Sequence, residues 1–161
     1  MNLRTIALPL LLSTAAFLGG CKKDPCKDVT CQNGGSCVDG SCVCPAGFEG
    51  TNCEVSIRAK FLGLYNVTET CPDEVYSYQF TISAGSSSAT AIIIDNISHW
   101  GPVNGTVSGN SLTIPTQQAF DSGFSITVTG SGQLSGNILN MSYTLSADGE
   151  SDSCTAVCTR L

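Results

Sequence analysis

Ten cysteines are the residues of this 161-residue chain whose type and spacing most strongly indicate chemistry, and six of them lie between Cys26 and Cys53. Thiols at this density either bind a metal such as zinc or oxidise to disulfides. A single residue separates Cys42 from Cys44. We interpret this spacing as one that directs the two thiols to different disulfide partners rather than to one tetrahedral zinc. So short a segment cannot bury enough apolar surface to fold alone, and we predict that disulfides stabilise it.

Few other residues could form a catalytic site. The single histidine, His99, lies beside the single tryptophan, Trp100. A metal site needs several converging ligands and a Ser-His-Asp site needs a third group of fixed geometry, and the sequence shows neither. The carboxylates are scattered over turns. We therefore predict no catalytic residue, no metal site and no cofactor; His99 and Trp100 are expected to plug or decorate a loop, with a role at a ligand mouth as the alternative.

The residues between the six cysteines are more specific than the spacing. Asn33-Gly34-Gly35 lies between the second and third cysteines, and Cys44-Pro45-Ala46-Gly47-Phe48-Glu49-Gly50 precedes the last. Six cysteines allow fifteen pairings, and spacing does not choose among them. With these motifs, residues 26–53 resemble an EGF-like domain. The resemblance implies the disulfides Cys26–Cys37, Cys31–Cys42 and Cys44–Cys53, and a two-stranded ribbon near residues 36–43.

Glycines and lysines refine this interpretation. Gly34 and Gly35 can supply positive φ in a tight bend.

Calcium-binding members of the family carry acidic and amide residues just before the first cysteine, whereas this chain has Lys22-Lys23-Asp24-Pro25. Two lysines would repel a cation that needs six to eight oxygen ligands, so we expect no calcium site.

The first twenty residues have the composition of a secretory leader. Arg4 is followed by an apolar run from residue 6 to 18 that is too short to span a bilayer comfortably. The run ends in Leu18-Gly19-Gly20-Cys21, which resembles a lipobox, the cleavage and lipidation sequence of bacterial lipoproteins. The resemblance implies that residues 1–20 are removed and that acyl chains on Cys21 hold the protein on the membrane. An ordinary signal peptide with an incidental Cys21 is the alternative.

The segment 21–25, a lipidated cysteine with a short charged tether, resembles the start of surface-displayed lipoproteins of some diderm bacteria. We expect attachment to the cell outer membrane, with outward display preferred over the periplasmic face. Both locations preserve disulfides. The formal net charge is −6, so nucleic acid and anionic lipid headgroups are poor electrostatic partners.

After residue 53 the composition changes to Thr, Ser, Ile, Val and Gly with frequent turn dipeptides, which predicts an antiparallel β-domain over residues 55–161. The predicted strands cover residues 61–71, 75–83, 89–95, 105–107, 111–114, 124–130, 138–145 and 154–160. The glycine-rich pieces at 105–109 and 130–136 lack the lysine and following helix of a phosphate site and are predicted to be hairpin turns.

About eight sequential strands with short connections favour an all-β, up-and-down barrel, because closure removes the edges of the sheet. Phe61-Leu62-Gly63-Leu64-Tyr65-Asn66-Val67, with a glycine two residues before an aromatic, resembles the start of lipocalin-like small barrels. A jelly-roll or immunoglobulin-like β-sandwich is the alternative fold. In a closed meander the first and last strands are neighbours, which predicts the disulfide Cys71–Cys154 and leaves Cys158 as a buried free thiol. A reactive or intermolecular Cys158 thiol is the alternative.

Together these features predict a non-enzymatic, membrane-anchored cell-envelope lipoprotein. Its EGF-like domain is a spacer, and its barrel binds an unknown protein or glycan partner. The alternative is a lipocalin-like carrier of a small hydrophobic ligand, lined by Tyr65, Tyr76, Tyr78, Phe80, Phe124, Met141 and Tyr143. An eight-strand barrel of this size leaves little lumen, so we expect a filled interior. An enzyme using acidic residues on the barrel rim is the least favoured hypothesis.

Replacing Cys21 by serine tests the anchor. The variant should move from the membrane fraction to the soluble fraction, because serine cannot receive the thioether-linked acyl chains. The measurement is fractionation of cells followed by immunoblotting, with Cys158→Ser as the matched control. A Cys21→Ser protein that stays in the membrane fraction contradicts the lipobox interpretation.

Overall fold

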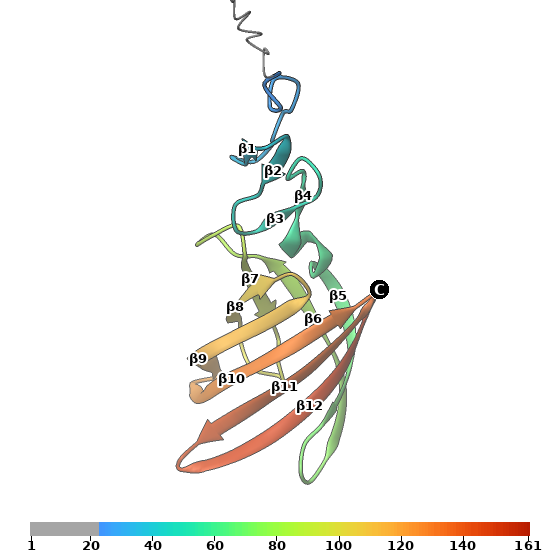
Figure 1. Cartoon of the computed structure of the whole chain (residues 1–161). Coiled ribbons are helices and arrows are strands. Elements are labelled where there is room, and N and C mark those ends of the chain that lie inside the picture. Colours follow the sequence, from blue (N-terminus) through green and yellow to red (C-terminus); the bar gives the residue numbers. More distant parts are fainter. Residues whose placement is uncertain (1–22) are drawn as a thin grey trace, which may run out of the picture.

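The computed structural model describes residues 23–161, and its architecture is all-β (Figure 1). The lipidation site predicted at Cys21 and the leader before it lie outside the described residues. A disulfide-rich segment comes first, and a closed eight-stranded antiparallel barrel follows. Within residues 23–161, no helix has both the length and the apolar character needed to cross a membrane.

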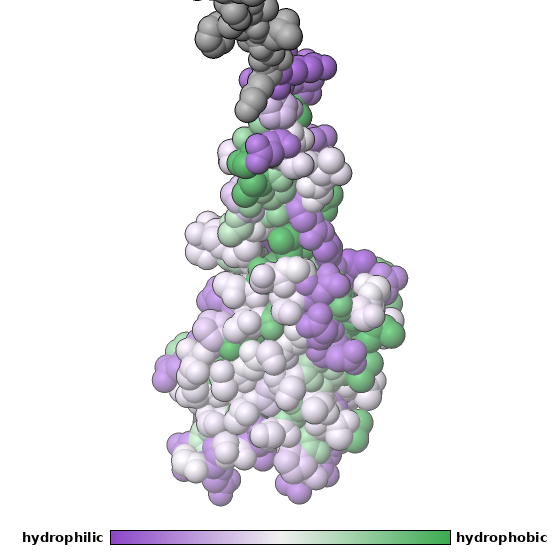
Figure 2. Space-filling model, viewed as in Figure 1, coloured by the Kyte–Doolittle hydropathy of each residue, from purple (hydrophilic) through white to green (hydrophobic). Residues whose placement is uncertain are grey.

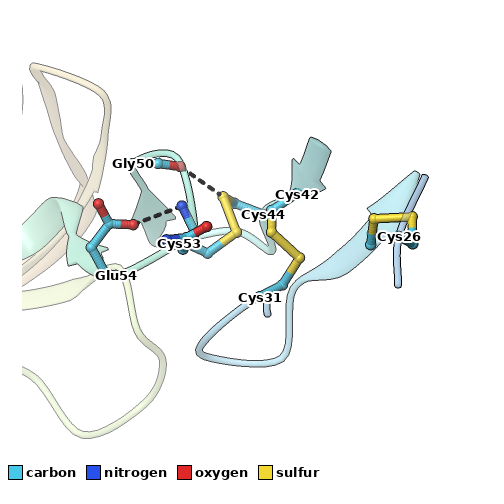
Figure 3. The surroundings of a disulfide bond; sticks show 9 residues. Cys26, Cys31, Cys42, Cys44, Gly50, Cys53 and Glu54 are labelled. Atoms are coloured by element: carbon cyan, nitrogen blue, oxygen red, sulfur yellow. Dashed lines mark hydrogen bonds between the residues drawn. A yellow bond between two sulfur atoms is a disulfide. The ribbon is translucent and has the colours of Figure 1, made fainter. Parts of the chain in front are cut away.

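Three disulfides hold the first segment together (Figure 3). They join the cysteines that were expected to pair: Cys26–Cys37, Cys31–Cys42 and Cys44–Cys53. Strands β1 (Ser36–Val38) and β2 (Ser41–Val43) form the expected ribbon, and β3 (Phe48–Glu49) pairs with β4 (Val55–Ser56). In residues 26–56 Cys53 is the fully buried hydrophobic residue and the aromatic Phe48 is half-buried, so the covalent bridges take the place of an apolar core.

The two glycines of the Asn33-Gly34-Gly35 motif have different roles. Gly34 has the expected positive φ, at 81°, but Gly35 does not. A Cβ atom on Gly35 would lie 2.7 Å from the Sγ atom of Cys53. Gly35 therefore provides space for a sulfur atom, and the expectation of positive φ at this residue was wrong.

Eight strands form the barrel, and each pairs antiparallel with its neighbour in the sequence. Their bounds are β5 (Gly63–Thr70), β6 (Val75–Ala84), β7 (Ala91–Asp95), β8 (Val103–Ser108), β9 (Ser111–Asp121), β10 (Phe124–Ser135), β11 (Ile138–Ala147) and β12 (Glu150–Arg160). β12 returns to pair with β5, so the sheet is closed. The predicted up-and-down barrel is confirmed, and the alternative β-sandwich is excluded.

Alternation along the strands decides which side chains fill the barrel. In β5, Tyr65, Val67 and Glu69 are buried, and the residues between them are exposed. Buried apolar side chains from all eight strands form one cluster with Phe61 and Ile97, which lie just outside the strands. The interior is therefore packed with the side chains of the protein itself, as its strand number leads one to expect.

The hairpin turns predicted within residues 105–109 and 130–136 are present at Gly109 and Gly136 but are shorter than predicted, because the residues before these two glycines belong to strands. β10 continues to Ser135, and Gly136 is the residue that turns, with a φ of 59°. Gly130 lies opposite Tyr143, and a Cβ atom on Gly130 would be 2.5 Å from the Cβ of Tyr143. Gly105 likewise lies within β8, close to the side chain of Leu112. Both glycines make room for a larger neighbour inside the barrel.

β9 also extends beyond its predicted end at Ile114. Proline cannot donate a backbone hydrogen bond, so Pro115 favours a break in the strand. The pairing with β10 instead shifts register, with Ile114 opposite Gly130 and Gln117 opposite Val128. The extra residue on β9 forms a bulge that accommodates the proline, and the strand continues to Asp121.

The seam between the first and last strands of the barrel carries the fourth disulfide. Cys71 and Cys154 form the bridge, next to the paired residues Thr70 and Thr155. Cys158 is fully buried opposite Val67 and forms no disulfide. Both observations agree with the sequence-based expectation for these cysteines.

The link between the two parts of the molecule is fixed by polar contacts. The 3-10 helix η1 (Ile57–Lys60) follows β4, and the Arg58 guanidinium donates to the backbone oxygens of Gly85 at 2.8 Å and Ser88 at 3.0 Å. Lys60 forms an ion pair with Glu49 of the disulfide-rich segment. These contacts hold that segment against one end of the barrel, which gives the elongated molecule of Figures 1 and 2.

Replacing Gly130 by alanine tests this packing. The added methyl group meets the backbone and Cβ of β11, so the free energy of unfolding should fall by about 2 kcal/mol or more. Ser131→Ala, on the exposed neighbouring residue, should change it by less than about 0.5 kcal/mol. Urea denaturation measures both variants; equal effects contradict the packing role of Gly130.

Candidate functional site

The end of the barrel opposite the disulfide-rich segment is called the distal mouth. It is formed by the turns β5–β6, β9–β10 and β11–β12, together with the connection between β7 and β8. Figure 1 shows the β5–β6 and β11–β12 turns at the bottom, far from the start of the described chain. Residues from distant parts of the sequence therefore meet at this end.

The connection between β7 and β8 contains a strained turn, and its residues 96–101 are called the mouth loop. Asn96, Ser98 and His99 have positive φ values of 69°, 48° and 68°. Such conformations cost free energy for residues with a Cβ atom, so surrounding contacts must hold them. Ile97 supplies one such contact, since its side chain is fully buried in the barrel core.

Backbone hydrogen bonds fix the rest of the mouth loop. The N–H of Trp100 donates to the carbonyl of Ile97 at 2.8 Å, which closes the turn. The N–H of Gly101 donates to the carbonyl of Phe120 at 3.0 Å, which ties the loop to β9. The loop therefore closes over part of the mouth as an ordered plug.

Glu69 is a fully buried carboxylate beneath the mouth loop. The hydroxyl of Ser98 donates to its Oε1 at 2.9 Å, and its Oε2 has no hydrogen-bond partner among the described residues. Ala156 lies opposite Glu69 on β12, and its small side chain leaves room for the carboxylate. A buried carboxylate costs free energy unless it is hydrogen-bonded, so the bond from Ser98 couples the mouth loop to the barrel interior.

Two tyrosines extend this polar cluster. The backbone N–H of Ser98 donates to Oη of Tyr78 at 2.8 Å, and Oη of Tyr78 lies 3.3 Å from Oη of Tyr143. Burial raises the pKa of both phenols, and the nearby Glu69 raises each pKa further. Both tyrosines are therefore protonated at neutral pH and can donate hydrogen bonds within the cluster.

A pocket of about 220 Å³ opens at the distal mouth and is called the mouth pocket. Trp100, Ile126 and Leu145 form its apolar wall, and Glu150 and Asp152 bring carboxylates to it. Ser146, Ala147 and Ser151 complete the lining. The residues come from the mouth loop, β10, and the β11–β12 hairpin, so only the closed barrel brings them together.

The distal mouth is also where negative charge gathers. Asp73 and Glu74 lie in the β5–β6 turn, Asp121 ends β9, and Asp148, Glu150 and Asp152 surround the β11–β12 turn. The single Lys or Arg between residues 63 and 160 is Arg160, at the opposite end of the barrel. The electrostatic potential at the mouth is therefore negative.

The seven residues expected to line a ligand cavity do not form one surface. Tyr65, Phe80, Met141 and Tyr143 are buried in the packed core, and Tyr78 is partly buried against it. Tyr76 and Phe124 are 37% and 73% exposed, so placing these two in the interior was wrong. They lie near the distal ends of β6 and β10, beyond the packed core.

His99 and Trp100 have separate environments. The His99 ring packs against Tyr78, with 4.9 Å between ring centroids, and its side chain is exposed. Trp100 is partly buried against the core and lines the mouth pocket. Of the two expected roles, Trp100 therefore has that of a plug and reaches a pocket, whereas His99 decorates the exposed side of the loop.

Glu69, Cys71 and Cys154 have potential ligand atoms within 4.8 Å of one another. The two sulfurs are bonded to each other, however, and zinc binds thiolates. In its disulfide form this group does not provide a metal site.

Sequence reasoning missed Glu69 and the acidic residues of the mouth pocket. The signal for Glu69 was present, because Tyr65, Val67 and Glu69 alternate on the inward face of one strand. Glu150 and Asp152 gave no such signal, since a hairpin turn is an ordinary position for exposed carboxylates. Their relation to Trp100 depends on how the strands close.

Comparison of the chain with models of known protein families gives no match.

Cys158 is the free thiol among the described residues, and it faces the sulfur of Met141 at 3.8 Å. Burial raises its pKa to about 12, with a further contribution from the charge of Glu69. Because the thiolate is the reactive species, the folded protein should protect this cysteine from alkylation at neutral pH.

Iodoacetamide should alkylate Cys158 much more slowly in native protein than in guanidinium-unfolded protein throughout pH 7 to 9, because in the folded protein the thiol is buried and its pKa is raised. Below its pKa the thiol is neutral, so a raised pKa lowers the thiolate fraction over this range. The measurement is the alkylation rate followed by mass spectrometry, and Cys158→Ser controls for labelling elsewhere. Equal rates in native and unfolded protein contradict this prediction.

Proposed function

We propose that this protein is a non-enzymatic, membrane-anchored lipoprotein of the cell envelope that binds a protein or glycan partner through the distal mouth of its barrel. In this proposal Cys21 carries the acyl chains, and residues 26–53 form an EGF-like spacer. The barrel is then presented away from the outer membrane, facing outward from the cell.

The observation that carries the proposal is the position of the mouth pocket. It lies at the end of the barrel opposite the disulfide-rich segment, which in the chain directly follows the proposed anchor. A binding surface at this end remains accessible while the other end is directed toward the membrane.

Exposed aromatic residues support a role for the same end in binding. Phe120 and Phe124 are 61% and 73% exposed, and both lie in the β9–β10 hairpin. Phe124 is two residues from Ile126, which lines the mouth pocket. Aromatic side chains are enriched in protein interfaces, and exposed apolar surface beside a pocket is typical of a binding site.

The contacts at the junction support the role of a spacer. Arg58 is bonded to the barrel turn at Gly85 and Ser88, and Lys60 pairs with Glu49. The EGF-like interpretation rests on its residue motifs, its three disulfides and its ribbon. A spacer fixed in this way directs the barrel rather than letting it move independently.

The alternative function, a carrier of a small hydrophobic ligand, has less support. The core residues fill the barrel interior, and the mouth pocket has about 220 Å³, whereas ligand pockets begin at roughly 300 Å³. Two carboxylates in its lining also disfavour a purely apolar ligand.

The proposal can be tested with full-length protein in neutral-lipid vesicles, applied to arrays of glycans and peptides. Phe124→Ser should weaken binding of captured ligands at least about fivefold, because an interface aromatic is removed. Ile138→Ser removes an apolar residue that is 43% exposed at the opposite end of the barrel, and it should leave binding unchanged. Equal effects of the two variants, or no ligand for the wild type, contradict the proposal.

A further inference from the structure

The acidic residues of the distal mouth have no cationic partner within the described chain. Among residues 23–161, the ion pair in the structure is Lys60–Glu49, which lies at the other end of the barrel. Arg58 and Arg160 are also at that end, and both donate to backbone oxygens there. The charge of the mouth is thus not neutralised internally.

The mouth pocket combines this charge with an apolar wall. Glu150 and Asp152 supply the carboxylates, while Trp100 supplies an aromatic ring and Leu145 an aliphatic surface. A lysine or arginine side chain has matching chemistry, because its methylene stem can cover apolar surface while its charged head pairs with carboxylates. A cation beside a tryptophan ring gains further electrostatic attraction.

The size and composition of the pocket restrict the class of ligand further. About 220 Å³ accommodates a side chain rather than a larger compound. A hard divalent cation would need six to eight oxygen ligands, and the apolar wall offers none. Phe124, two residues along β10 from the pocket residue Ile126, provides exposed apolar surface on which the backbone flanking such a side chain could pack.

From these features we infer that the distal mouth docks a basic segment of a partner protein, with one lysine or arginine side chain inserted into the mouth pocket. This inference rests on the proposed function and specifies its partner as a basic polypeptide. Charge complementarity argues for this occupant, and it argues equally against acidic glycans and anionic lipid surfaces.

The probe is a fluorescently labelled peptide of twelve residues. In this peptide a basic residue, arginine or lysine, alternates with glycine or serine. Its binding to the full-length protein in neutral-lipid vesicles is measured by anisotropy. A peptide with glutamate in place of each basic residue is the charge control. The basic peptide should bind and the acidic peptide should not, and affinity should fall as the salt concentration rises.

The double variant Glu150→Gln, Asp152→Asn should lower the affinity for the basic peptide about tenfold or more. The control is a second double variant on the disulfide-rich segment, Asp39→Asn with Glu54→Gln. It changes the net charge by the same amount and should reduce the affinity for the basic peptide less than twofold. This matched pair separates a local site from a general effect of negative charge. Circular dichroism of both variants confirms that the barrel is retained.

Equal losses in the two double variants, or equal binding of the acidic peptide, overturn the inference. Calcium binding that depends on Glu150 and Asp152, without peptide binding, also overturns it and identifies a metal site instead. If the basic peptide does not bind while Phe124→Ser still weakens binding of an array ligand, this inference fails and the proposed function stands. If both assays fail, the proposed function fails as well.

Discussion

The last strand of the barrel pairs with the first, and most features of the molecule depend on this closure. Pairing of β12 with β5 leaves neither strand with a free edge, and the Cys71–Cys154 disulfide bonds the two ends of the sheet beside that seam. Once the sheet is closed, every inward residue must lie in one shared interior. That constraint buries Glu69 together with Tyr143 and Cys158, although they belong to three different strands.

Closure also gives the barrel two ends that differ in their contacts. At the end next to the disulfide-rich segment, Phe61 is fully buried, its carbonyl accepts the hydroxyl of Tyr65 at 2.8 Å, and Arg160 donates to the carbonyl of Lys60. That end is sealed by groups that satisfy one another. At the distal end, the mouth loop is held in strained backbone conformations by its bonds to Glu69 and Tyr78.

The distal end therefore combines features that stability alone does not require. Glu69 keeps one carboxylate oxygen without a partner among the described residues, and the surrounding turns carry acidic side chains without basic neighbours. Natural proteins tolerate such departures mainly where binding or catalysis uses them. The packed interior also favours a binding role for the distal end, because a filled barrel can bind a partner only at its ends or on its outer surface.

The sequence by itself determined the inward face of most strands and the number of barrel strands, because side-chain direction in a strand follows from local backbone geometry with a period of two. It did not determine how far the packed core extends along each strand, so Tyr76 and Phe124 are exposed. The pairing of Cys71 with Cys154 followed instead from the inferred closure of the sheet, which makes the first and last strands neighbours. Local patterns failed where neighbouring strands decide: β10 continues past its predicted end at Gly130, and β9 passes Pro115 because a bulge accommodates the proline. Only the tertiary structure decided that Trp100, Ile126 and Asp152 share a pocket, since strand register and closure, which no local pattern encodes, set the distances between residues of different strands.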